Sequence, residues 1–128
     1  MTNKAADKLK SDGWKIVETS GFLHLIGPLW QRVVDGTHEY ALATEDKHHN
    51  RRGLVQGGVI MTFADRTCGM TARFVSGKPT LATVQLDTHF VEAACGTLDP
   101  QPDFHHDGSD RRQTLYRDGE RRVQDIEE

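Results

Sequence analysis

A ten-residue segment just before the middle of the chain combines an amide, two arginines and a glycine pair, and reads His49-Asn50-Arg51-Arg52-Gly53-Leu54-Val55-Gln56-Gly57-Gly58. An apolar stretch follows, so Gly57-Gly58 is predicted to open a helix. Glycines at a helix start leave N–H groups unhindered, and these groups carry the positive end of the helix dipole. They can hold a polarised carbonyl, which is the chemistry of an oxyanion hole. The alternative is that the glycines only let the helix pack closely on a sheet.

A single carboxylate, Asp65, stands in the middle of the apolar residues 57–74. Burying a charge in such a helix is costly unless the charge is paired or functional. As a functional group, Asp65 would be a nucleophile or a general base. The alternatives are an ion pair with Arg66 or Arg73, or exposure of Asp65 on one helix face.

The spacing of these groups predicts a site made by two chains. Gly57 and Asp65 are eight positions apart, which on one helix is about 12 Å along the axis. A carbonyl held at the Gly57 N–H therefore cannot reach Asp65 of the same chain. A two-fold dimer would bring each helix start beside the carboxylate of the other chain.

The elements that must position these groups are one helix and a sheet. Residues 57–74 are apolar around most of the helix circumference, which predicts a buried helix about 27 Å long. Asp35-Gly36 predicts a tight turn between strands at 29–34 and 37–44. Residues 80–93 alternate apolar and polar, with Thr83 on the polar side, and are predicted to form the clearest strand. A helix of this length needs a sheet wrapped round it.

The two ends of the chain are less regular. Residues 1–12 are predicted to be a short polar helix or a frayed end. An irregular lead-in follows, whose apolar residues could lie on the core: Phe22, Leu23, Leu25 and Ile26. The polar tail, residues 99–128, is dense in charge, and Pro100 and Pro102 disfavour an interior strand. We therefore expect residues 99–110 to be mobile or irregular, and Asp118-Gly119 to turn a last hairpin that pairs residues 113–117 with 120–126.

Composition excludes several classes of function. A net charge of −3 and a pI of about 6.1 give no electrostatic footprint for nucleic acid or an acidic membrane surface. The N-terminus lacks an apolar signal region, and no apolar run approaches the roughly 20 residues of a membrane span. Cys68 and Cys95 are expected to be reduced thiols, and no metal-ligand spacing is present among the histidines. We expect one cytoplasmic domain over residues 1–128, with no metal and no cofactor.

Residues 14–98 resemble the hotdog-fold acyl-CoA thioesterase family, in the branch of phenylacetyl-CoA thioesterase and the human thioesterase-superfamily proteins. The family pattern Asn-x-x-Gly-x-x-His-Gly-Gly-x-x-x-x-x-x-Asp is matched without a gap by Asn50, Gly53, Gly57, Gly58 and Asp65. Gln56 takes the place of the family histidine. The alternating segment 82–90, with Gly96 to follow, is similar to the next family feature.

The resemblance implies an α+β hotdog: a curved antiparallel sheet wrapped round one long central helix, assembled as a homodimer or homotetramer. It implies that the Gly57 N–H and the Asn50 side chain hold the thioester carbonyl, while Asp65 of the other subunit attacks it or activates water. Thr83 matches a position where relatives carry a hydroxyl that helps to place water. Substrate-binding roles are expected for Gln56, Gly58, Arg51, Arg52 and Lys78. The three basic residues among these would meet the phosphates of CoA, or else are solvated surface charge.

The predicted function is hydrolysis of an acyl-CoA-type thioester, and the alternative is a catalytically silent acyl-CoA-binding module. Gln56 favours the silent module, because glutamine forms hydrogen bonds but cannot titrate. Asp65 favours the hydrolase, because a pure binding site gains nothing from an unpaired carboxylate near a thioester. A hotdog dehydratase is less favoured, since its catalytic histidine is absent. The acyl group is not defined by the sequence.

Overall fold

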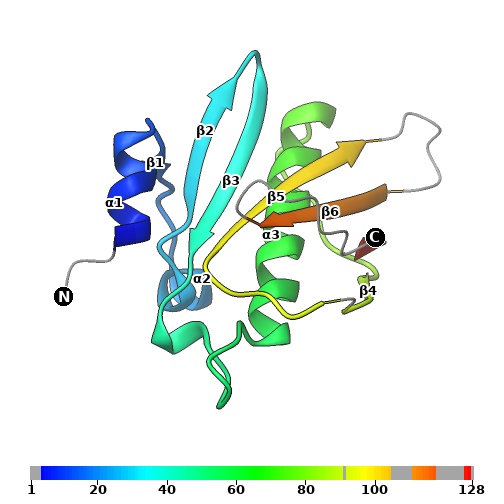
Figure 1. Cartoon of the computed structure of the whole chain (residues 1–128). Coiled ribbons are helices and arrows are strands. Elements are labelled where there is room, and N and C mark those ends of the chain that lie inside the picture. The colour runs from blue at the N-terminus through cyan, green and yellow to red at the C-terminus, as the bar shows by residue number, and fades with distance from the viewer. Residues whose placement is uncertain (1–3, 91, 105–110, 118–125, 128) are drawn as a thin grey trace.

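The computed structural model describes residues 4–90, 92–104, 111–117 and 126–127, and side chains within residues 4–90 and 92–98. Figure 1 shows an antiparallel sheet with one long helix, α3, against it and a short helix, α1, on its other side. The helices are α1 (Lys4–Ser11), α2 (Gly21–Ile26) and α3 (Gly57–Ser76), with a 3-10 turn at Asp46–His48. The strands are β1 (Lys15–Ile16), β2 (Trp30–Val34), β3 (Thr37–Ala43), β4 (Asp87–Thr88), β5 (Thr97–Phe104), β6 (Arg111–Arg117) and β7 (Ile126–Glu127). They lie in the order β1-β2-β3-β5-β6-β7-β4.

The core lies between α3 and the inner face of the sheet. Ile60, Phe63 and Ala64 of α3 pack with Tyr40 and Leu42 of β3, and Phe63 is completely buried. Burying each large apolar side chain contributes about 1.5–3 kcal/mol to folding. The predicted central helix is confirmed and is two residues longer than expected. Its C-terminal turn departs from all-round burial, since Phe74 and Val75 are 58% and 68% exposed.

The outer face of the sheet has a second, smaller core under α1. Because side chains alternate along a strand, Ala41 and Ala43 of β3 point away from α3 and contact this second cluster. Leu9 of α1 packs there with Trp14 and Trp30. Helices on both faces therefore hold β2 and β3 in place, and the sheet is a firm support for α3.

The predicted hairpin is confirmed. β2 and β3 pair from Trp30↔Ala41 to Val34↔Thr37, and the two residues between them are Asp35 and Gly36. Both have positive φ, 51° and 77°. That is the backbone twist a two-residue hairpin requires.

The prediction of a long strand over residues 80–93 is wrong for most of the described residues in that segment. Only Asp87 and Thr88 form a strand, β4, and they pair with β7 at the end of the strand order. Residues 80–86 have no regular secondary structure, and Val84 is 99% exposed. Alternation predicts a strand only where a neighbouring strand accepts its hydrogen bonds, and residues 80–86 have no such neighbour among the described residues.

The lead-in also differs from expectation, since it contains the helix α2. Phe22 and Leu25 are not in the core, being 61% and 69% exposed, whereas Leu23 and Ile26 are half-buried. A helix of six residues can turn only one side toward the body of the protein.

Residues 99–110 were expected to be mobile or irregular. That prediction is wrong for residues 99–104, which belong to strand β5. β5 lies between β3 and β6, and its pairs with β6 run through Pro100↔Leu115 and Pro102↔Gln113. Its pairing with β3 is confined to Thr97 and Leu98. Both prolines therefore lie where one edge of β5 has no partner among the described residues, a position that tolerates the missing N–H groups. Residues 105–110 and the Asp118-Gly119 turn lie outside the described residues, while β6 and β7 do pair, at Gln113↔Ile126.

Candidate active site

The loop that leads into α3 is closed by the Asn50 side chain. Its Oδ1 accepts hydrogen bonds from the backbone N–H groups of Arg52 (2.8 Å) and Leu54 (3.2 Å). Gly53 completes the turn with a φ of 75°. Since Oδ1 is used within the loop, the Nδ2 amide is the group of Asn50 left to donate to a ligand.

A buried histidine anchors the same loop. His48 is 1% exposed, its Nδ1 accepts from the Glu45 N–H (2.9 Å), and its Nε2 donates to the carbonyl of Ile26 at the end of α2. These partners define a neutral ring with the proton on Nε2. The His48 carbonyl accepts from the Gln56 N–H (2.9 Å), so one residue joins α2, the loop and the start of α3. The sequence analysis considered the histidines only for metal-ligand spacing, which it did not find, and no local pattern distinguishes His48 from His49.

The start of α3 presents two free backbone donors. Gln56 is the N-cap residue, its side chain is exposed and forms no cap hydrogen bond, and its carbonyl accepts from Val59 and Ile60. The N–H groups of Gly57 and Gly58 have no acceptor among the described residues, as expected in the first turn of a helix. The ring of Phe90 lies against Gly57, where an added Cβ would be 3.0 Å from the ring Cζ. Gly57 therefore permits a close approach, to an aromatic ring rather than to the sheet.

Asp65 is half-buried in the middle of α3 and is hydrogen-bonded to Thr83. The Thr83 Oγ1 donates to the Asp65 Oδ1 at 2.5 Å. The ion pair with Arg66 or Arg73 that the sequence left open is not formed, because the salt bridges of the described residues are Arg32–Glu39 and His49–Asp46. The structure thus brings together two of the four predicted catalytic residues, and their contact crosses from α3 to the segment after it.

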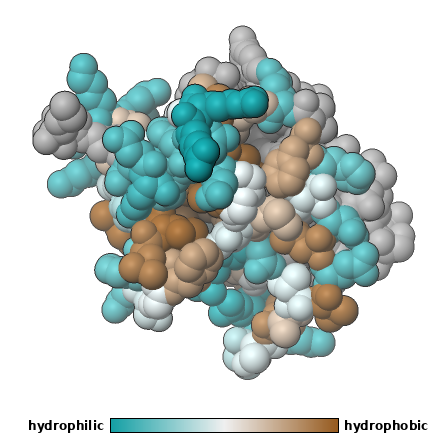
Figure 2. Space-filling view, turned by 90° about the horizontal axis from the view of Figure 1, so that it is seen from below, coloured by the Kyte–Doolittle hydropathy of each residue, from teal (hydrophilic) through white to brown (hydrophobic). Residues whose placement is uncertain are grey.

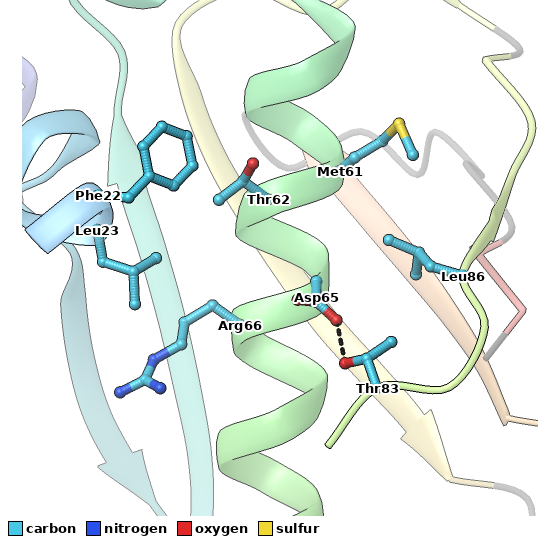
Figure 3. A pocket seen from close by; sticks show the side chains of 8 residues that line it. All are labelled: Phe22, Leu23, Met61, Thr62, Asp65, Arg66, Thr83 and Leu86. Atoms are coloured by element: carbon cyan, nitrogen blue, oxygen red, sulfur yellow. Dashed lines mark hydrogen bonds between the residues drawn. The ribbon is translucent and has the colours of Figure 1, made fainter. Parts of the chain in front are cut away.

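A cavity of about 500 Å³ opens in front of this pair (Figure 3). Asp65 and Thr83 lie on one side of α3 together with Met61 and Leu86, while Arg66 runs toward the side on which Leu23 lies. The full lining is Phe22, Leu23, Met61, Thr62, Asp65, Arg66, Thr83 and Leu86. The volume of this cavity, and its lining of apolar side chains with a few polar groups, are typical of a site for a small molecule.

The other predicted site residues do not line this cavity. Gly57 and Asp65 are about 12 Å apart along α3, so one chain does not bring the free N–H groups and the carboxylate together. Arg51 and Arg52 are exposed before the start of α3, and Lys78 is exposed just after its end. The 20 residues of α3 put about 30 Å between these ends, so Lys78 does not act with the arginines in one chain.

Figure 2 views the molecule from the end at which α3 begins. Strongly hydrophilic side chains lie there beside an apolar area. This face of the molecule therefore carries a polar area and an apolar area side by side.

Arg66 and Arg73 add positive charge that sequence reasoning considered only as a partner for Asp65. Both lie close enough to Tyr40 to lower the pKa of its phenol, although the larger effect of burial raises that pKa overall. The Nε atoms of both arginines are buried and have no hydrogen-bond partner among the described residues. No local pattern would have identified these groups, because both lie near Tyr40 of β3, and Arg66 also shares the cavity lining with α2.

No group of three or more His, Cys, Asp or Glu side chains in the described part of the chain could hold a metal ion. Among the described helices, none is long and apolar enough to cross a bilayer. Cys68 and Cys95 are both free thiols.

No protein-family model and no curated protein matches the sequence. Solved structures do match. Zebrafish thioesterase superfamily member 2 aligns with a TM-score of 0.65 at 17% identity, over 99% of this chain and 96% of that one. A phenylacetic acid degradation-related protein from Ralstonia eutropha gives 0.62 at 20% identity, over 96% and 95%. A Bacillus halodurans protein solved with CoA gives 0.67 at 19% identity, over 98% and 80%.

At sequence identities of 17–20%, the similarity to these solved structures shows the fold alone. The chain has the α+β hotdog architecture predicted for it, with a curved antiparallel sheet around one long helix.

Proposed function

We propose that this hotdog-fold chain is a cytoplasmic thioesterase that hydrolyses acyl-CoA-type thioesters, with Asp65 as nucleophile or general base. The observation that carries the proposal is a carboxylate without an ion-pair partner among the described residues, held by a threonine hydroxyl at a largely apolar cavity. A carboxylate that only solvates the surface would need neither a cavity in front of it nor a hydroxyl that holds it, and Asp65 has both. The zebrafish neighbour is named for the thioesterase superfamily, and the Bacillus neighbour was solved with CoA.

The site is completed by a second copy of the chain in a homodimer or homotetramer. In the proposed arrangement, the Gly57 N–H and the Asn50 Nδ2 of one copy donate to the thioester carbonyl oxygen. Asp65 of the other copy removes a proton from water, and the resulting hydroxide attacks the carbonyl carbon. Charge that develops on the oxygen is stabilised by the same donors at the helix start. The carbon–sulfur bond then breaks, and the thiol leaves with the proton that Asp65 took.

Thr83 is a positioning residue in this scheme. Its hydroxyl donates to the Asp65 Oδ1 and fixes the carboxylate, which leaves Oδ2 to face water or substrate. Gln56 and Gly58 lie next to the carbonyl site and bind the substrate there. Arg51 and Arg52 meet the phosphates of the carrier, and Lys78 is near enough to do so only from another subunit.

The second candidate is a catalytically silent acyl-CoA-binding module. The observation that favours it is Gln56, exposed at the N-cap without a hydrogen bond to the helix. A silent module would bind acyl-CoA and release no thiol. Measured thiol release therefore separates the two functions.

The test is release of free thiol from short, long and aromatic acyl-CoAs by the protein and by Asp65→Asn. If Asp65 acts in catalysis, turnover falls by about 10²-fold or more. Asp87→Asn is the matched control: Asp87 also accepts one side-chain hydrogen bond, from Gln85 (2.7 Å), but does not line the cavity. Equal turnover of Asp65→Asn and the wild type would refute the catalytic assignment. Binding without thiol release in the wild type would establish the silent module.

A further inference from the structure

The cavity holds one positive charge that the proposed hydrolysis does not use. Arg66 lines the cavity, its Nε is buried without a partner, and the hydrogen bonds and ion pairs of the described residues do not include its guanidinium. Arg66 is half-buried, and a partly buried cation is stabilised by a counter-ion in the same environment. An anion that enters the cavity would supply the missing partner.

Asp65 does not supply it. The two residues are adjacent on α3, so their side chains leave the helix about 100° apart. In Figure 3, Asp65 is held by Thr83 on one side, whereas Arg66 extends toward Leu23 on the other. The cavity therefore has an acidic side, on which Met61 also lies, and a basic side, on which Leu23 and Phe22 also lie.

The chemistry of the basic side selects a carboxylate or a phosphate. The planar guanidinium presents paired donors that match two oxygens of such a group, and these charge-assisted bonds are stronger than neutral ones. The carboxylate of an acyl chain would lie on the acyl side of the thioester, inside the cavity. The phosphates of the carrier lie beyond the sulfur, on the side assigned to Arg51 and Arg52.

We propose that Arg66 binds a carboxylate on the acyl group, so that the preferred substrates are thioesters of short dicarboxylic acids. The inference rests on the proposed thioesterase function and narrows its substrate class. The thioester carbonyl lies at the Asp65 side of the cavity, the free carboxylate lies at the Arg66 side, and the methylene groups between them contact the apolar lining.

The test compares succinyl with butyryl thioesters, which have acyl chains of the same length with and without a carboxylate. Each acyl group is offered on CoA and on N-acetylcysteamine, which has no phosphate. In Arg66→Gln, the ratio of kcat/KM for succinyl over butyryl should fall by about 10- to 100-fold on both carriers. Arg73→Gln is the matched control, because Arg73 is on the same helix with the same unpartnered Nε and does not line the cavity.

Three results would overturn the inference. The succinyl-to-butyryl ratio is unchanged in Arg66→Gln, or it falls equally in Arg73→Gln. Alternatively, Arg66→Gln slows both CoA substrates equally and leaves both N-acetylcysteamine substrates unaffected, which would assign Arg66 to the carrier phosphates. If Arg66→Gln does not fold, Arg66→Lys keeps the charge but loses the planar fork, and the same fall in ratio is expected.

A binding measurement separates failure of this inference from failure of the proposed function. Monomethyl succinate, whose ester stands in for the thioester, should raise the melting temperature of the wild type more than methyl butyrate does, and Arg66→Gln should lose the difference. If no thioester is hydrolysed but monomethyl succinate binding depends on Arg66, the thioesterase proposal fails and the carboxylate site stands. If thioesters are hydrolysed and monomethyl succinate stabilises no more than methyl butyrate, the carboxylate site fails alone.

Discussion

Replacing His48 by leucine should destabilise the protein far more than the same change at its neighbour His49. His48→Leu keeps a buried side chain of similar size but removes both ring nitrogens. The Ile26 carbonyl then loses its donor, and the Glu45 N–H loses this acceptor. Each buried polar group left without its partner costs about 1–3 kcal/mol. Two such groups together would cost about 2–6 kcal/mol. Because Ile26 and Glu45 are only half-buried, we expect the free energy of unfolding to fall by an amount in the lower part of that range, about 2–4 kcal/mol.

That loss is a large fraction of the roughly 5–15 kcal/mol by which a domain is stable. For a chain of 128 residues it corresponds to a fall of roughly 6–16 °C in melting temperature. The matched change, His49→Leu, removes only weak contacts: the His49 Nε2 is 3.4 Å from the Thr44 hydroxyl, and its Nδ1 is 3.9 Å from Asp46. We expect less than about 1 kcal/mol from His49→Leu.

The assay is urea unfolding followed by tryptophan fluorescence, with thermal melts as a second measure. The reasoning is refuted if the two variants lose equal stability, or if His48→Leu unfolds at the wild-type urea concentration. An unchanged slope of unfolding free energy against urea would show that the change acts on stability and not on the compactness of the unfolded chain.

Two further predictions concern the helix start and the assembly. Gly58→Ala should stabilise the protein by up to about 1 kcal/mol, because alanine favours a helix and nothing lies within 4 Å of the added Cβ. Gly57→Ala should stabilise it less, because the added Cβ meets the Phe90 ring. Equal urea midpoints for the two variants would contradict that contact. Light scattering should give at least twice the chain mass of 14.4 kDa, since in the proposed site Gly57 and Asp65 act together only between chains. A monomer that still hydrolyses thioesters would exclude the two-chain site.

Local sequence determined the features that depend on neighbours along the chain. The Asp35-Gly36 turn follows from the residue types at two positive-φ positions. The central helix follows from an apolar segment without proline, which ends at Gly77 with a φ of 69°. The family resemblance carried by the motif around Asn50 and Gly57 also predicted the fold correctly. Two of its residues shape the loop before α3, since Asn50 accepts a backbone hydrogen bond there and Gly53 has a positive φ.

Tertiary structure decided the features that depend on partners far away in the sequence. Residues 80–86 alternate like a strand but have no strand beside them among the described residues, whereas β5 pairs with β6 in spite of Pro100 and Pro102. His48 and His49 are alike in sequence, yet only His48 is placed under the end of α2. The contact of Thr83 with Asp65, and the position of Arg66 without an ion pair among the described residues, also depend on segments far away in the sequence. Hydrogen bonds and desolvation are set by what packs against a group, and that packing brings together segments that the sequence holds far apart.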